Sequence, residues 1–272
     1  LNGVRLLSPS FDTPGPMART TMDAAVMLRA MADPLAEEMV GEANRMVHIA
    51  SEIDAGLEGI RIGVPSNYFF DALDPEIASI VQNAINALVM LGAEQVQVEL
   101  GSVERLAAAQ LGILTLEAYQ NVMAATDGDI TRVNSTLRAR LKDGMNVSMR
   151  SGEDLLVALG RLRAERDDAL AVYRRATGNI DVLVAPVLQR SPPTIEAART
   201  DYQWMPNLTR PFNASHQPVI SVPCGWTNAG LPVGFQIVAP KYRERTAIRV
   251  AYTFEQSQHA PERRWPELPL EA

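Results

Sequence analysis

The sequence predicts an α/β fold in which a mixed β-sheet is flanked by helices. Strand-like and helix-like segments alternate over most of the 272 residues. The run at 180–186 is almost continuously apolar, which is typical of a central strand covered on both faces. Strand-like segments at 218–223 and 233–239 flank Asn228-Ala229-Gly230, residues that favour a hairpin turn. A hairpin contributes antiparallel pairing, so the sheet is expected to be mixed.

The first half of the chain predicts a strand–helix–strand unit. Its expected elements are a loop at 6–16, a helix from Thr20 or Thr21 to Ala32, irregular structure at 35–58, a strand at 60–65, a helix at 74–91 and a strand at 95–100. Asp74-Pro75 combines an N-cap residue with a first-turn proline, which indicates where that helix begins. Two strands joined by a helix predict a βαβ unit with a right-handed crossover.

The second half predicts further helices, a central strand and the hairpin. Its expected elements are helices at 103–125 and 151–176, a strand at 180–186, a loop at 187–211, strands at 218–223 and 233–239, and a helix at 245–256. Leucines recur at helical spacing within 151–176, with arginines on the opposite side, so one side is expected to be buried. The loop at 187–211 holds four prolines and has little periodicity, which is typical of a functional or covering loop.

Composition excludes several classes of function. The net charge is −7 and no basic run occurs, so we expect no nucleic-acid partner. The single cysteine and three scattered histidines lack metal-ligand spacing, so we expect no metal and no cofactor. No apolar stretch approaches the roughly 20 residues of a membrane span, and the opening residues lack a signal-peptide pattern. These observations predict an acidic cytoplasmic protein without membrane contact.

Local motifs assign no catalytic residue. The chain has no G-x-S-x-G elbow, no H-E-x-x-H and no glycine-rich phosphate loop. His216 has no neighbour in sequence that would orient it as a base, and Cys224 at a strand end favours an inert buried thiol. Neither Lys142 nor Lys241 lies in an apolar segment of the kind that activates a lysine base.

Two segments resemble the amidase signature family of hydrolases. Residues 8–20, S-P-S-F-D-T-P-G-P-M-A-R-T, followed by D-A-A, resemble the end of the family's signature region. P-F-N at 211–213, I-S-V-P-C-G at 220–225 and G-L-P-V-G-F-Q at 230–236 resemble its C-terminal strand pair. Further similar segments at 61–65, 181–186 and 254–256 follow in the family's order, so the resemblance covers essentially the whole chain.

The resemblance implies an incomplete amidase-signature-like fold. Residues 1–272 would be the C-terminal part of a single domain, divided into the end of the signature region (1–34), helical and strand elements (35–210) and the C-terminal strand pair and helix (211–272). Family members hydrolyse carboxamides with a serine nucleophile, a second serine in a cis peptide bond and a lysine base, all upstream of the motif at 8–20. No residue here matches those positions, so the catalytic set is expected outside this chain. An edge or face of the sheet is expected to be open where the missing N-terminal part would pack.

The resemblance also indicates two substrate-binding segments. The loop Phe11-Asp12-Thr13 resembles the segment nearest the nucleophile strand, although Asp12 could instead cap backbone N–H groups. The covering loop resembles the variable wall of the acyl pocket, although its side chains could simply pack the loop. Its candidate residues are Trp204, Asn207, Thr209, Phe212 and Asn213. His216 replaces a glycine that is usual in the family, which leaves the backbone geometry at that position open.

Three functions remain from these observations. The first is the pocket-forming part of an amidase that releases ammonia or an amine from a small carboxamide, with homodimerisation through the open sheet. The second is a glutaminase-type subunit that feeds ammonia to a tRNA-charging complex. It ranks lower because Pro206 stands where that branch usually carries an acidic residue. The third is a non-catalytic interaction domain, which predicts a closed core without an open strand edge.

Overall fold

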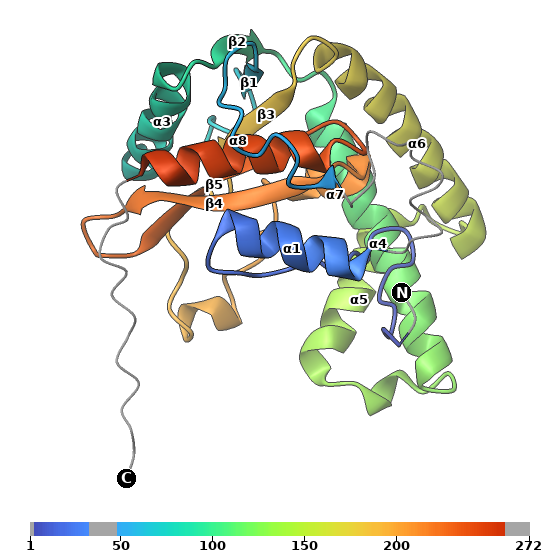
Figure 1. Cartoon of the computed structure of the whole chain (residues 1–272). Helices are drawn as coiled ribbons and strands as arrows, with labels where there is room; N and C mark the ends of the chain where they lie inside the picture. The colour runs from blue at the N-terminus through green and yellow to red at the C-terminus, as the bar shows by residue number, and fades with distance from the viewer. Residues whose placement is uncertain (1–2, 33–47, 259–272) are drawn as a thin grey trace.

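The strands form one mixed sheet in the order β2-β1-β3-β5-β4 (Figure 1). In this computed structural model, residues 3–32 and 48–258 are described. The strands are β1 (Arg61–Pro65), β2 (Glu94–Val98), β3 (Val182–Pro186), β4 (Val219–Trp226) and β5 (Pro232–Val238). β1 is parallel to β2 and to β3, whereas β5 is antiparallel to β3 and to β4. The predicted mixed α/β sheet, the βαβ unit and the hairpin are therefore confirmed.

Helices cover both faces of the sheet. They are α1 (Thr21–Met31), α3 (Pro75–Met90), α4 (Val103–Ala125), α5 (Ser135–Ser148), α6 (Leu155–Ala176), α7 (Arg210–Ser215) and α8 (Glu244–Ser257), with 3-10 turns at Ile130–Arg132 and Ala197–Arg199. α3 and α8 pack on one face, and α4, α6 and α7 lie on the other (Figure 1). α3 begins where predicted, because Asp74 Oδ1 accepts hydrogen bonds from the amides of Glu76 and Ile77 at 2.9 and 3.3 Å.

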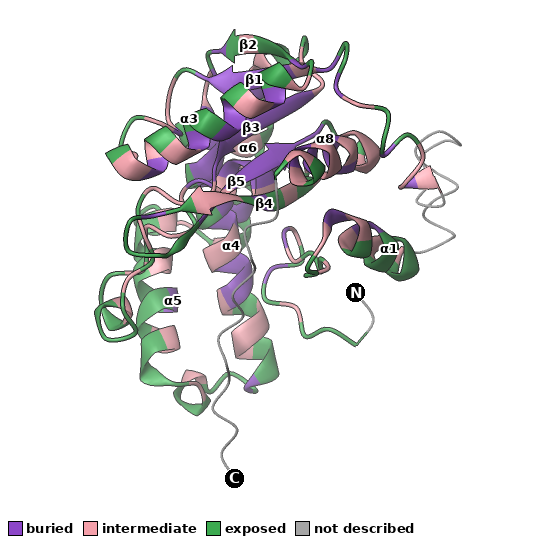
Figure 2. Ribbon diagram, turned by 60° about the vertical axis from the view of Figure 1, so that its left-hand side comes forward, coloured by how far each residue is buried: buried purple, intermediate pink, exposed green. Residues whose placement is uncertain are grey.

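The central strand β3 is buried on both faces (Figure 2). Val182 and Val184 point into the core cluster with α3 and α8, whereas Leu183 and Ala185 point into the cluster with α4, α6 and α7. Alternate side chains of a strand face opposite sides of the sheet, so a strand with helices on both sides needs an unbroken apolar run. The apolar run at 180–186 therefore contains a central strand covered on both faces, as the sequence predicts.

β4 is an open edge of the sheet. Within residues 3–32 and 48–258, β5 is the strand that pairs with it, and its other edge has no strand partner. Val219 and Trp226 are 43% and 53% exposed, and Ser221 and Pro223 are also exposed. An edge of eight residues presents a row of unpaired backbone groups. β2 forms the sheet's other edge, and packing of a further segment on β4 stays a prediction.

The largest differences from the sequence prediction are two helices and the start of α6, whereas the other predicted helix and strand boundaries shift by three residues or fewer. α5 and the short α7 were not predicted, and α6 begins at Leu155 rather than at Ser151. The amide of Leu156 donates to Asp154 Oδ1 at 2.8 Å, which makes Asp154 the N-cap of α6. Of the segment expected to be irregular, residues 48–58 form turns, and the part before residue 48 lies outside the described residues. The family-based boundaries at 34 and 210 stay predictions.

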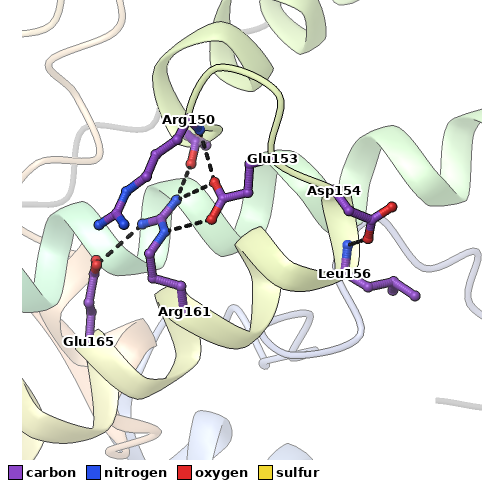
Figure 3. A network of polar contacts seen from close by, with 7 residues as sticks. Arg150, Glu153, Asp154, Leu156, Arg161 and Glu165 are labelled. Atoms are coloured by element: carbon purple, nitrogen blue, oxygen red, sulfur yellow. Dashed lines mark hydrogen bonds and ion pairs between the residues drawn. The ribbon is translucent and has the colours of Figure 1, made fainter.

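A charged network joins α5 to α6 (Figure 3). Arg161 donates to both carboxylate oxygens of Glu153 at 2.9 and 3.0 Å, to Glu165 at 3.2 Å and to the carbonyl of Ser148 at 2.9 Å. The hydrogen bonds from Arg161, with a further one from the amide of Arg150, lower the pKa of Glu153 to about 2. The turn between the two helices is therefore fixed by one bidentate ion pair.

Candidate substrate site

The loop at residues 8–13 is anchored to α4 by one carboxylate. Glu117 is 3% exposed, and its oxygens accept hydrogen bonds from the Ser8 hydroxyl at 2.6 Å, the Ser10 amide at 3.0 Å and the Ser10 hydroxyl at 2.5 Å. Arg163 of α6 donates to the same carboxylate at 2.9 Å. Burial alone would raise the pKa of Glu117, but the hydrogen bonds from Ser10, Ser8 and Arg163 outweigh it and lower the pKa. An ionised, fully bonded carboxylate therefore holds this loop.

The three candidate residues of the loop occupy different environments. Phe11 is 4% exposed and packs with apolar side chains of α4 and α6. Asp12 Oδ2 accepts hydrogen bonds from the amides of Leu7 and Ser8 at 2.6 and 3.1 Å, which is the backbone-capping role considered as the alternative. Thr13 is exposed, and its hydroxyl donates to the carbonyl of Phe11 at 3.3 Å. Thr13 is thus the member of this trio with an accessible side chain.

Asn213 of α7 lies against the same loop. Its Nδ2 donates to the carbonyl of Phe11 at 3.3 Å, and its Oδ1 accepts from Gln110 Nε2 of α4 at 3.1 Å. Gln110 is buried, and its Oε1 has no hydrogen-bond partner in the described chain. The neighbouring Phe212 lies in the core, where its ring stacks on that of Phe69 at a centroid distance of 5.2 Å. Asn213 therefore connects α4 to the loop, whereas Phe212 packs beneath it.

The covering loop is held by polar contacts of its own. Asn207 Oδ1 accepts from Arg210 at 2.6 Å, and the Asn207 carbonyl accepts from the Tyr68 hydroxyl at 2.9 Å. The Arg190 guanidinium lies 4.4 Å from the centroid of the Trp204 ring, in cation–π geometry. Thr209 donates to the carbonyl of Pro206 at 3.1 Å. Trp204, Asn207 and Thr209 therefore all take part in packing this loop.

A hollow of about 380 Å³ lies beside the open edge of the sheet. It is bordered by Ala18 from the N-terminal segment, Arg190 from the covering loop, and Ser221 and Pro223 of β4. None of the eight candidate residues lines it, but Arg190 links its rim to Trp204. The hollow thus lies between Ala18, the first part of the covering loop and the exposed part of the sheet.

Three potential nucleophiles among the residues described, Cys224, Ser8 and Ser215, are not activated. Burial raises the pKa of Cys224 to about 12, so its thiol stays protonated and inert at neutral pH. Ser8 and Ser215, both buried, donate their hydroxyls to acceptors of the protein. Over residues 3–32 and 48–258 no group of three or more His, Cys, Asp or Glu residues could hold a metal ion. The same residues include no helix long and apolar enough to cross a membrane.

His216 keeps a glycine-like backbone. Its φ and ψ are 55° and 36°, in the left-handed region, and it ends α7. Burial lowers the pKa of its imidazole, and the positive charges of Arg166, Lys241 and Arg174 lower it further. A residue with a Cβ atom is strained in this region, so His216 adopts its conformation at some cost.

Comparison with known proteins identifies the family. The sequence profile of the amidase family matches residues 1–248. The chain belongs to the amidase (amidase signature) family. It is 32% identical to a glutamyl-tRNA(Gln) amidotransferase subunit of Myxococcus xanthus (strain DK1622), over 93% of this chain and 56% of that protein. It is also 32% identical to an amidase of Pseudomonas putida, over 94% of this chain and 55% of that protein.

A solved structure supports the family fold. It is described as a vestigial protein complex that reveals the evolutionary origins of an s-triazine catabolic enzyme, and it aligns with a TM-score of 0.77 at 23% identity. The alignment covers 94% of this chain and 56% of that chain. This amidase family chain therefore spans about half the length of the relatives it matches.

Gln110 and Glu117 contribute to the site, but the sequence patterns did not single them out. Both lie on the buried side of α4, beside Ile113 and Leu116. A carboxylate and an amide among apolar helix positions require hydrogen-bond partners from elsewhere in the fold. That pattern was visible in the sequence, although the partners, more than 100 residues away, were not.

Proposed function

We propose that this chain is the pocket-forming C-terminal part of an amidase that hydrolyses a carboxamide to a carboxylate and ammonia or an amine. The catalytic serines and lysine would lie on a segment outside these 272 residues. The observation that carries the proposal is the open edge of β4, which runs beside a hollow bordered by Ala18 and by Arg190 of the covering loop. A segment adding to that edge would bring its side chains next to the hollow.

The chain's two lysines and the buried serines Ser8 and Ser215 support an external catalytic set. Lys142 and Lys241 are both exposed. A lysine acts as a base when it is removed from water, because burial favours its neutral form. The hydroxyls of Ser8 and Ser215 already donate within the fold. Neither lysine therefore has the burial that a base requires, and both of these hydroxyls are already engaged.

Amide hydrolysis explains why such a set is required. A serine hydroxyl attacks the carbonyl carbon, while a neutral lysine takes its proton through the second serine. The same relay returns the proton to the departing nitrogen, and backbone N–H groups stabilise the oxyanion. Water then hydrolyses the acyl-enzyme by the same route. This chain's part in that sequence is to bind and orient the substrate.

In this proposal, three side chains of this chain would contribute to the pocket of the whole protein. Thr13 is exposed at the end of the anchored loop, Asn213 is half-buried beside it, and Trp204 is half-buried in the covering loop. An indole with amide and hydroxyl groups suits a substrate with an apolar body and one polar group. Phe11 and Phe212, being buried, would support the pocket from behind.

The test compares the native polypeptide with the isolated 272-residue chain. Ammonia release is measured with a panel of aliphatic and aromatic carboxamides, and serine reactivity is measured with a fluorophosphonate probe. We expect the longer polypeptide to hydrolyse at least one amide and to label, and the isolated chain to do neither. Hydrolysis by the isolated chain at the same rate would overturn the external catalytic set. Failure of the longer polypeptide on every amide would overturn the amidase function.

A glutaminase function is the second candidate. It is favoured by the likeness to the glutamyl-tRNA(Gln) amidotransferase protein of Myxococcus xanthus. Pro206 in the covering loop offers no carboxylate to hold a substrate amino group, which disfavours glutamine. L-glutamine therefore belongs in the amide panel. Ammonia released from glutamine in preference to simple carboxamides would replace the first proposal with this one.

A further inference from the structure

A second cavity lies on the face of the sheet covered by α6, away from the open edge of β4. Its volume is about 290 Å³, at the small end of the range for small-molecule sites. It opens between the end of α6, the start of β3 and the end of β5. Its wall is mainly apolar, with Leu170, Ile180 and Val238 among its residues, and it also includes the polar side chains of Tyr173, Thr177, Ser215 and Gln217.

The charged residues that line this cavity are both cations. Arg174 and Lys241 border it, and no Asp or Glu does. Both are exposed, and neither forms an ion pair with a carboxylate anywhere in residues 3–32 and 48–258. The whole chain has 32 acidic residues against 25 basic ones, so an acid-free border with two such cations departs from its average surface.

The neighbouring His216 lies in the same positive potential. The imidazole of His216 has its pKa lowered first by burial and then by the charges of Arg166, Lys241 and Arg174. Arg166 is compensated in part by Asp167, which accepts its hydrogen bond at 2.7 Å. Arg174 and Lys241 have no carboxylate partner in the described residues, so their positive potential at the cavity mouth is available to an anion.

We propose that this cavity binds a small monocarboxylate, with the apolar body against Leu170, Ile180 and Val238 and the carboxylate between Arg174 and Lys241. Guanidinium and ammonium groups both donate charge-assisted hydrogen bonds to carboxylates. The volume admits a body about the size of a phenyl ring or a short alkyl chain. A phosphate or sulfate is disfavoured because it would leave the apolar wall uncovered.

This cavity bears on the proposed function, although binding of a carboxylate in the cavity does not depend on that function. A carboxylate is the product class of amide hydrolysis. If that function holds, the cavity lets the protein bind its product class away from the hollow beside β4. Failure of amide hydrolysis would leave this site intact, and absence of binding here would leave the hydrolysis intact.

The test is a titration with benzoate and hexanoate, followed by methyl NMR and calorimetry. It is made on the isolated chain and on the native polypeptide. We expect shifts of the Ile180 and Val238 methyl groups, with a dissociation constant on the order of 1 mM. Benzyl alcohol, which is neutral, is expected to bind at least about fivefold more weakly, because it lacks the charge-assisted contacts.

Variants that remove one positive charge test whether the ligand's carboxylate binds between Arg174 and Lys241. Arg174→Gln and Lys241→Gln should each weaken benzoate binding about threefold or more, and the double variant about tenfold or more. Lys142→Gln, at the chain's other lysine in α5, is the matched control and should change nothing. All three residues are exposed, so these variants are expected to fold. Unshifted Ile180 and Val238 methyl groups, or equal affinity in the double variant, would overturn the proposal.

Discussion

The carboxylate of Glu117 lies 2.6 Å from the Ser8 hydroxyl, across a separation of 109 residues in sequence. Both residues are buried, and the bond joins the N-terminal loop to the long helix α4. Because Ser10 and Arg163 donate to the same carboxylate, one side chain ties the loop at 8–13 to two helices. Thr13 ends this anchored loop, and Asn213 donates to its Phe11 carbonyl.

Glu117→Gln is expected to release this loop. Glutamine keeps the size of the side chain but loses the charge, and its NH2 group faces donors that already point inward. We expect a loss of about 2 kcal/mol in the free energy of unfolding, with faster amide exchange at residues 8–13. Denaturant unfolding and hydrogen exchange measure the two effects.

Glu165→Gln provides the control for that experiment. Glu165 also contacts an arginine, but its side chain is 44% exposed, so the cost should stay below about 0.5 kcal/mol. Equal costs for the two variants, or unchanged exchange at residues 8–13 in Glu117→Gln, would contradict the anchoring role.

Acid is expected to destabilise the fold through two carboxylates. Glu117 and Glu153 both have lowered pKa values in the folded protein, that of Glu153 being about 2 against an ordinary value of 4.5. A carboxylate with a lowered folded pKa contributes stability above its ordinary pKa and loses it as the pH falls toward the folded value. Stability should therefore decline between about pH 4.5 and about pH 2. Denaturant unfolding over that range measures it.

Glu153→Gln tests the assignment of that decline. The variant cannot ionise at this position, so its stability should fall less steeply with pH than that of the wild type. A wild-type curve that is flat below pH 4.5, or an identical slope in the variant, would contradict the assignment.

Backbone strain at His216 can be measured by comparing two variants. Both His216→Gly and His216→Ala remove the ring that stacks on Phe11 at a centroid distance of 6.0 Å. Only glycine is relaxed at a φ of 55°. The glycine variant should therefore be more stable than the alanine variant by about 1 kcal/mol in denaturant unfolding. An alanine variant of equal or greater stability would show that the left-handed conformation is not strained.

The open edge of β4 is expected to make the isolated chain self-associate. Its exposed residues include Val219 and Ser221, and its backbone groups on that side have no strand partner in the described chain. Sedimentation velocity should detect dimers or larger species. Val219→Lys, which puts a charge on the edge, should shift them toward monomer.

Met90→Lys is the matched control for the edge. Met90 is 89% exposed at the end of α3, away from β4, so its replacement should leave association unchanged. A wild-type chain that stays monomeric at high concentration would contradict the edge as a docking surface, as would equal effects of the two substitutions.

The sequence predicts best where one local signal decides the structure. Asp74-Pro75 locates the start of α3, the continuous apolar run locates β3, and Asn228-Ala229-Gly230 locates the hairpin. In each case the signal is a cap, a burial pattern or a turn that acts within a few residues. The mixed sheet follows from these elements in order.

The missed elements depend on distant contacts. α5 has one fully buried residue, Leu141, so it has almost no apolar stripe to detect. Its Gly144 is required by the close approach of Thr115 in α4, which no local pattern reveals. The anchoring by Glu117 and the link from Gln110 through Asn213 likewise join segments that are more than 100 residues apart. Their residue types were visible, but their partners were not.

In the proposed function, this chain works as the pocket-forming part of a larger amidase. The intact mass of the native polypeptide, detected in its source with an antibody against this chain, tests it most directly. We predict a product well above 29.7 kDa, with a lysine and paired serines upstream of Leu1. A native product of 29.7 kDa would contradict the claim and would favour a binding role for this chain.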